Sequence, residues 1–203
     1  MVSRFPRTNG TGRTGSGLPY RPAAMQEGRS HTVPGEPPMP ARPLVLFPDP
    51  RLSHPAAPVE AFGPDLSALV ADVWDTLLEV SAIGLTAPHI GVPARVVVIR
   101  MSPETERRVY VNPVVLWASP ETATHEEGSV SMPGVRERIT RPAHIRFGYR
   151  DLEGAKHEQI AEGFEAAVVQ HEIDQLDGVF WIDRLSRLKR ERLLKRFGKT
   201  KSG

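Results

Sequence analysis

The chain contains no cysteine among its 203 residues. Disulfide bonds are therefore excluded, which fits a reducing compartment, and no thiolate is available as a metal ligand. Long apolar runs are also missing, because none approaches the roughly 18 residues that cross a bilayer. A short run such as residues 96–99 is typical of a buried strand. The sequence predicts a cytoplasmic globular protein with no membrane partner.

The formal net charge is only +2, because 26 Lys and Arg residues nearly balance 24 Asp and Glu residues. The excess is concentrated at the C-terminal end, where residues 184–203 hold nine Lys or Arg and a single acid, Glu191. A basic end of this kind favours an anionic neighbour such as RNA or a membrane surface. The alternative is a solvated terminal helix, and the composition does not separate the two.

Residues 1–42 lack apolar periodicity and are rich in Gly, Pro, Ser, Thr and Arg. This composition is typical of a disordered segment, and the apolar core of a signal peptide is missing. A transit peptide fits the arginines but not the Gly and Pro content. We expect 1–42 to be a disordered extension, or to precede a true start at Met25 or Met39, and 43–203 to form one domain.

Three segments show the periodicity of helices. The first opens at Pro64, with Asp65 as the expected N-cap, and repeats apolar residues every three or four positions. The second spans residues 163–176, and Gly178 supplies its C-terminal stop. The third begins near Ser186 and is basic.

The region between the first two helices is rich in strand-forming residues. Residues 95–100 form one predicted strand, and residues 145–150 alternate in the manner of a half-buried strand. Two further stretches, 109–111 and 114–117, are separated by Asn112-Pro113, so a bend is expected there. Helices that bracket a run of strands predict an α+β fold.

The second helix carries the sequence Gln170-His171-Glu172-Ile173-Asp174-Gln175, an altered form of the H-E-x-x-H zinc motif. In that motif two histidines four residues apart share one helical face and hold the metal, while the glutamate acts as a general base. His171 and Glu172 keep the first half of the pattern, but Gln175 stands at the second histidine. On this segment alone, a buried structural histidine is the simpler interpretation.

Two further segments change that interpretation. One is a small-residue loop at 83–91, between a helix and a strand, and the other is a loop at 127–134 that begins Glu-Gly-Ser-Val-Ser. With the helix segment, and with residues 47–52 and 176–179, they resemble the signature motifs of the peptide deformylase family. The resemblance covers roughly residues 44–196. It implies antiparallel sheets packed around a central motif-bearing helix, followed by a C-terminal helix.

The resemblance assigns roles to residues of the cleft. Gly84 and His89 fall in the first motif, and His89 stands where the family has a glutamine that helps hold the oxyanion. The backbone N–H of Val130, in the second motif, would be the other oxyanion donor. Glu172 would be the catalytic group that carries a proton to the leaving amine.

The resemblance also implies a divalent metal, Fe or Zn, held by one cysteine and two histidines. Ser129, His171 and Gln175 stand at these three positions, so two strong ligands are replaced by a hydroxyl and an amide. Glu127 and Arg141 are expected to form a supporting ion pair.

Three functions stay open on the sequence. The first is a metal-dependent deformylase that acts on N-formylmethionyl peptides, with His89 compensating as a ligand beside His171 and with Gln175 or Glu127 in support. The second is a catalytically silent relative that binds peptide N-termini, or the ribosome through the basic C-terminal helix. The third is a metal-free hydrolase with Ser129 as nucleophile and His171 as base, near Glu172 or Asp174.

Overall fold

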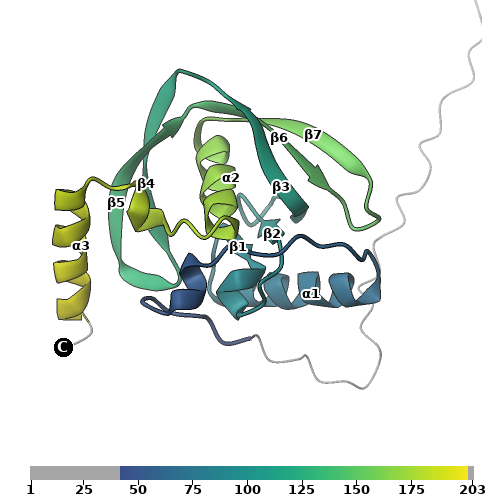
Figure 1. Ribbon diagram of the computed structural model, residues 1–203, viewed down its shortest axis with the longest axis horizontal. Helices are drawn as coiled ribbons and strands as arrows, with labels where there is room; N and C mark the ends of the chain where they lie inside the picture. Colours follow the sequence, from purple (N-terminus) through teal and green to yellow (C-terminus); the bar gives the residue numbers. More distant parts are fainter. Residues whose placement is uncertain (1–41, 201–203) are drawn as a thin grey trace, which may run out of the picture. The chain divides into compact units, whose positions relative to one another are not determined.

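The computed structural model describes residues 42–200, which form an α+β fold as predicted (Figure 1). The extension expected over residues 1–42 lies outside the described residues apart from its last position. Among the described residues, no helix is long and apolar enough to cross a membrane. The elements, with η for a 3-10 helix, are η1 (Pro50–Ser53), α1 (Pro64–Glu79), β1 (Gly84–Thr86), η2 (Ala87–Ile90), β2 (Val96–Ile99), β3 (Arg108–Ala118), β4 (Thr122–Ser129), β5 (Met132–Pro142), β6 (His144–Arg150), β7 (Lys156–Glu162), α2 (Gly163–Leu176), η3 (Trp181–Arg184) and α3 (Arg187–Thr200).

The strands form two antiparallel sheets. The larger has the order β1-β2-β3-β6-β7, and the smaller is the hairpin β4-β5. Helix α2 occupies the middle, with the curved sheets around it and α1 beneath β1 and β2 (Figure 1). The predicted arrangement of antiparallel sheets around a central motif-bearing helix is therefore confirmed.

Helix α2 has the bounds that the sequence predicts, because glycines stand at both ends. Gly163 at its start and Gly178 just past its end both have positive φ angles, of 55° and 76°, which glycine adopts at little cost. The helix is buried on several sides rather than on one face. Its apolar residues, such as Ile173, pack against Val97 and Phe147 of the larger sheet. Burying each such side chain contributes about 1.5–3 kcal/mol.

Strand β3 is continuous, although a bend at Asn112-Pro113 was expected to divide it. Asn112 has a φ of 52°, and the register with β6 shifts between Val111 and Val114, so the interruption is a bulge. The Asn112 side chain exchanges two hydrogen bonds of 2.8 Å with the backbone of Val59. These bonds hold the bulge in place while the ladder continues on either side of it.

The loop expected at 127–134 is the end of a β-hairpin, which was not predicted from the sequence. Strand β4 runs to Ser129 and β5 begins at Met132, so only two residues make the turn. The strands carry many charged and exposed side chains, and the turn has none of the Asn-Gly type residues that mark hairpins. Strand β7 was missed for the same reason, because it is mostly exposed.

Two smaller expectations also change. Asp65 lies in the first turn of α1 instead of capping it, and the N-cap is Gly63. The small-residue loop at 83–91 contains β1 and η2, so its backbone is more regular than the sequence suggested. Helix α3 follows the predicted start and packs on β5 through Leu193 and Phe197.

Candidate functional site

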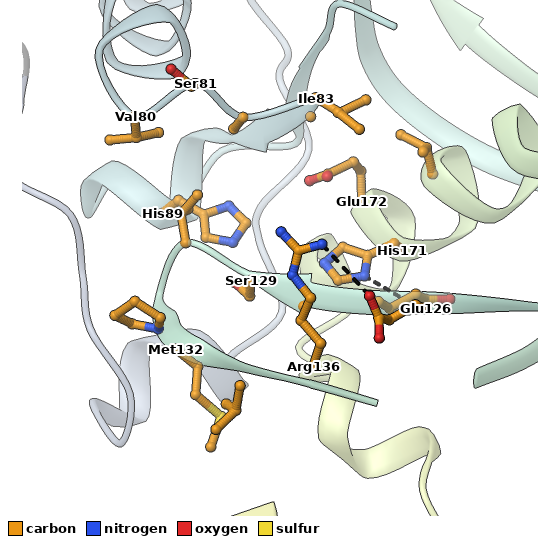
Figure 2. A pocket seen from close by; sticks show the side chains of 18 of the residues that line it. Val80, Ser81, Ile83, His89, Glu126, Ser129, Met132, Arg136, His171 and Glu172 are labelled. Carbon is orange, nitrogen blue, oxygen red and sulfur yellow. Dashed lines mark hydrogen bonds and ion pairs between the residues drawn. The ribbon is translucent and has the colours of Figure 1, made fainter. Parts of the chain in front are cut away.

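A cavity of about 430 Å³ lies between α2, β1 and the turn of the β4-β5 hairpin (Figure 2). The structure brings seven of the predicted site residues to its wall. They are Gly84, His89, Glu127, Ser129, Val130, His171 and Glu172. The other two, Arg141 and Gln175, are buried but do not line the cavity. The rest of the wall is mainly apolar and comes from the end of α1, the hairpin and the start of α2.

Glu172 is a buried carboxyl group without a hydrogen-bond partner at one of its oxygens. The side chain is 5% exposed, and its Oε2 atom makes no hydrogen bond. Burial raises the pKa of Glu172 to about 7, against the attraction of His171. The group is therefore poised to exchange a proton near neutral pH, which is the property that an acid–base residue needs.

Gly84 leaves the space that the Glu172 carboxyl group occupies. A Cβ atom added to Gly84 would lie 2.3 Å from Oε1 and 2.8 Å from Cδ of Glu172. No side chain fits there unless Glu172 moves. Position 84 of the first motif therefore requires glycine for steric reasons, because β1 approaches α2 closely there.

Replacing Gly84 with Ala is expected to displace Glu172 and to destabilise the fold by about 1–3 kcal/mol through overpacking. Urea unfolding followed by circular dichroism measures this. Gly198→Ala is the matched control, because nothing lies within 4 Å of the added methyl group and alanine favours a helix. If Gly84→Ala is as stable as the control variant, the close approach is not a constraint on the site.

Helix α2 and the hairpin are joined by a buried network of ionised groups. Arg141 donates from Nε and Nη2 to both oxygens of Glu127, at 2.7 and 2.9 Å, and from Nη1 to Asp174 at 2.7 Å. Arg184 then donates to both oxygens of Asp174. The predicted ion pair between Glu127 and Arg141 is present, but its extension to Asp174 and Arg184 was not foreseen.

His171 is oriented by this network. Its Nδ1 lies 2.9 Å from Oε2 of Glu127. Burial opposes ionisation of Glu127, but hydrogen bonds from His171 and Arg141 outweigh it and lower the pKa of Glu127 to about 2. The ionised Glu127 can only accept, so Nδ1 of His171 donates to it and Nε2 is left toward the cavity. Burial lowers the pKa of His171, but the bond to Glu127 and the charge of Glu172 prevail and raise it.

His89 is a neutral hydrogen-bond donor at the cavity wall. Its side chain is buried, and burial together with nearby His171 lowers its pKa to about 3. The backbone N–H of Thr86 donates to Nδ1 at 3.1 Å, so the ring proton sits on Nε2. An Nε2–H group can do the work expected of the family's glutamine, which is to donate to an oxygen in the cavity.

Gln175 and Ser129, which stand at two of the family's metal-ligand positions, make hydrogen bonds within the protein. The amide nitrogen of Gln175 donates to the carbonyl oxygen of Leu52 at 2.8 Å, across 123 residues of sequence. The hydroxyl oxygen of Ser129 accepts from the backbone N–H of Ser131 at 3.2 Å. Gln175 therefore ties α2 to η1, and Ser129 helps to close the hairpin turn.

The donor set does not fit an Fe or Zn site. His171 offers one imidazole nitrogen, while Ser129 and Gln175 offer only a neutral hydroxyl and a neutral amide, which are weak ligands for these ions. His89 could coordinate through Nε2 only by moving its proton to Nδ1, against the Thr86 N–H. Within residues 42–200, no three His, Asp or Glu side chains are grouped to hold a metal ion. The expected compensation by His89 finds no support in its hydrogen bonds.

Comparison with known proteins agrees with the fold and with the family resemblance. The model of the polypeptide deformylase family matches residues 41–191. A peptide deformylase-like protein of Bradyrhizobium diazoefficiens is 54% identical over 165 residues, which are 81% of this chain and 97% of that protein. A peptide deformylase of Phenylobacterium zucineum is 42% identical over 164 residues, covering 79% and 97%.

Solved structures give the same result. The crystal structure of a peptide deformylase from Legionella pneumophila matches with a TM-score of 0.74 and 35% identity, over 79% of this chain and 95% of the other. An actinonin complex of the Ehrlichia chaffeensis enzyme matches with a TM-score of 0.74 and 31% identity, over 80% and 98%. The chain belongs to the polypeptide deformylase family.

Proposed function

We propose that this member of the deformylase family binds the N-terminal residues of peptides in its cavity without metal-dependent hydrolysis. The observation that carries the proposal is the contrast between the two sides of the cavity. The donor at His89 and the buried Glu172 have kept the properties that the family's chemistry needs. The three metal positions hold one good ligand, His171, and the other two side chains make hydrogen bonds within the protein.

The size and lining of the cavity support a peptide terminus as ligand. A volume of about 430 Å³ accommodates one large apolar side chain with its adjoining backbone groups. Apolar residues from separate segments surround the polar groups, among them Ile83 before β1, Val130 in the hairpin turn and Val168 in α2. An N-terminal methionine would bury its thioether chain against them, while its backbone meets His89. Peptides that begin with methionine, formylated or not, are therefore the proposed ligands.

Purified protein is expected to bind Met-initiated tripeptides but to release no formate from a formyl-Met tripeptide, with or without added Fe(II), Ni(II) or Zn(II). Isothermal titration calorimetry measures the binding, and a formate assay under anaerobic conditions measures the turnover. Elemental analysis of the same preparation is expected to find less than stoichiometric metal. Metal-dependent turnover that is lost in Glu172→Gln would show instead that the chain is an active deformylase.

One observation favours metal-free hydrolysis as a second candidate. His171 donates to an ionised carboxylate, which orients a histidine base in many hydrolases, and Ser129 lines the same cavity. The carboxylate is Glu127, whereas Glu172 or Asp174 was expected from the sequence. In the described chain no hydrogen bond joins Ser129 to His171, so the proton acceptor is not in place before substrate binds. Formate release without metal, abolished by Ser129→Ala, would establish this function.

The ribosome stays a predicted partner, and the cytoplasm a predicted location. Helix α3 supports the first of these by its charge, because its exposed side carries Arg and Lys residues in excess of acids. The proposed domain limits of 43–203 likewise stay a prediction.

A further inference from the structure

Glu172 lines the proposed peptide site, and one oxygen of its buried carboxyl group has no hydrogen-bond partner. The side chain is more than nine-tenths buried, and its Oε2 atom makes no hydrogen bond with any described residue. Buried polar atoms in folded proteins are nearly always paired. Leaving a carboxyl oxygen unpaired costs about 1–3 kcal/mol, and more when it is charged. A ligand that pairs with this oxygen recovers that free energy.

The other charged groups on the wall already have partners. Glu127 forms an ion pair with Arg141 and accepts a hydrogen bond from Nδ1 of His171. Arg136 lies 3.7 Å from Glu126, and these two side chains are 73% and 62% exposed, so they form a solvated pair at the mouth. Figure 2 shows this pair and, deeper in the cavity, Glu172 beside His171. Of the carboxyl groups on the wall, Glu172 is therefore the one with an unpartnered oxygen, and its positive neighbour His171 already donates to Glu127.

Ser129 and Gln175, at two of the family's metal-ligand positions, also change the charge of the inner cavity. The family resemblance implies a divalent cation at the positions of Ser129, His171 and Gln175, a few side chains from Glu172. These residues do not fit such an ion, so the positive group beside Glu172 is His171, whose Nδ1 already donates to Glu127. A ligand can bring a positive charge itself, provided that its cationic group is small enough to reach the inner wall.

We propose that the cavity selects peptides that begin with a free, protonated α-amino group, and that this ammonium group donates to Glu172. The inference rests on the proposed peptide binding. A primary ammonium carries three N–H donors and one positive charge, and it stabilises the ionised form of a buried carboxyl group to which it donates. An N-formyl group removes that charge and adds a carbonyl oxygen, which only accepts. The preferred ligand would then be the product of deformylation rather than its substrate.

Calorimetric titrations with three tripeptides test the proposal. One begins with free methionine, one with formyl-methionine, and one with the des-amino analogue in which hydrogen replaces the ammonium group. The free-amine peptide is expected to bind the wild-type protein about tenfold or more tightly than either of the others, the size of one charged hydrogen bond. The des-amino peptide isolates the ammonium group without any change to the protein.

Variants identify the carboxyl group responsible. In Glu172→Gln, affinity for the free-amine peptide is expected to fall about tenfold, to the level of the formyl peptide, which itself changes little. Glu162→Gln makes the same change on an exposed residue at the start of α2, away from the cavity, and keeps the preference. Equal or tighter binding of the formyl peptide by the wild type overturns the inference and leaves peptide binding intact. Failure of all three peptides to bind overturns the proposed function as well.

Discussion

Replacing Arg141 with methionine is expected to lower the free energy of unfolding by about 3–5 kcal/mol. The guanidinium group is 4% exposed and holds two buried carboxylates, Glu127 and Asp174, at distances of 2.7 to 2.9 Å. Its removal leaves Glu127 with only His171 and leaves Asp174 with only Arg184. The cost comes from these uncompensated charges more than from the lost attraction. Urea unfolding of the wild type and the variant measures the difference.

Arg146→Met is the matched control for this experiment. Arg146 forms an ion pair of 2.9 Å with Glu158, but the two side chains are 50% and 56% exposed. An exposed pair of this kind contributes about 0–1 kcal/mol, because water screens it in the folded state and solvates it when it is broken. If both variants lose the same stability, the buried network around Arg141 is not a special support of the site. Loss of peptide binding in Arg141→Met alone would link that network to the orientation of His171.

The second large effect is expected from restoring the two ligands together. In the variant Ser129→Cys with Gln175→His, affinity for Zn(II) or Co(II) should rise by at least about a thousandfold. A complete zinc site is worth roughly 10–16 kcal/mol, so regaining two of its strong ligands recovers several kcal/mol, at about 1.4 kcal/mol per tenfold. Positions 171 and 175 are one helical turn apart on α2, so the second imidazole starts on the same face as the first. Titration with Co(II), followed by its visible absorption bands, measures the change.

The single variants and a third substitution control this result. Ser129→Cys alone and Gln175→His alone should each give a far smaller gain, because a site of this kind needs three protein ligands. Adding His171→Asn to the double variant should remove the gain. A double variant that binds no better than the wild type would mean that these three positions do not converge in this chain. The role of Gln175 in holding η1 through Leu52 would then be the stronger constraint on that position.

Elements whose signals are local could be predicted from the sequence. Helix α2 has its predicted bounds because Gly163 and Gly178 mark its ends, and β2 could be predicted because four consecutive apolar residues are all buried. The hairpin of β4 and β5 could not, because inward-facing positions such as Glu127 and Arg141 are charged, so the alternating burial leaves no apolar–polar pattern in the sequence, and because its turn lacks a glycine or asparagine. That omission matters, because the hairpin carries Glu127, Ser129 and Val130.

The site could be predicted only as far as the family motifs reach. The resemblance named nine site residues, and the structure brings seven of them to one cavity wall, whereas Arg141 and Gln175 are buried outside its lining. Contacts between distant segments were beyond a single sequence. Gln175 and Leu52 are joined across 123 residues, and His171 meets Glu127 across 44. The spacing of the motifs does not predict that the amide of Gln175 donates to a backbone carbonyl group. Nor does it predict that Glu127, which pairs with Arg141, also orients His171.

The hydrogen bond from Gln175 to Leu52 helps to hold the cleft together without a metal ion. A cleft held by a metal ion loses its geometry when a chelator or iron starvation removes the ion, and a thiolate ligand is consumed when peroxide oxidises it. Here α2 and η1 are joined by an amide and a carbonyl group, and the cysteine position holds a serine that oxidants leave unchanged. Binding at this cleft should therefore persist through oxidative stress and metal limitation, conditions that would disable a cleft built on a metal ion and a thiolate.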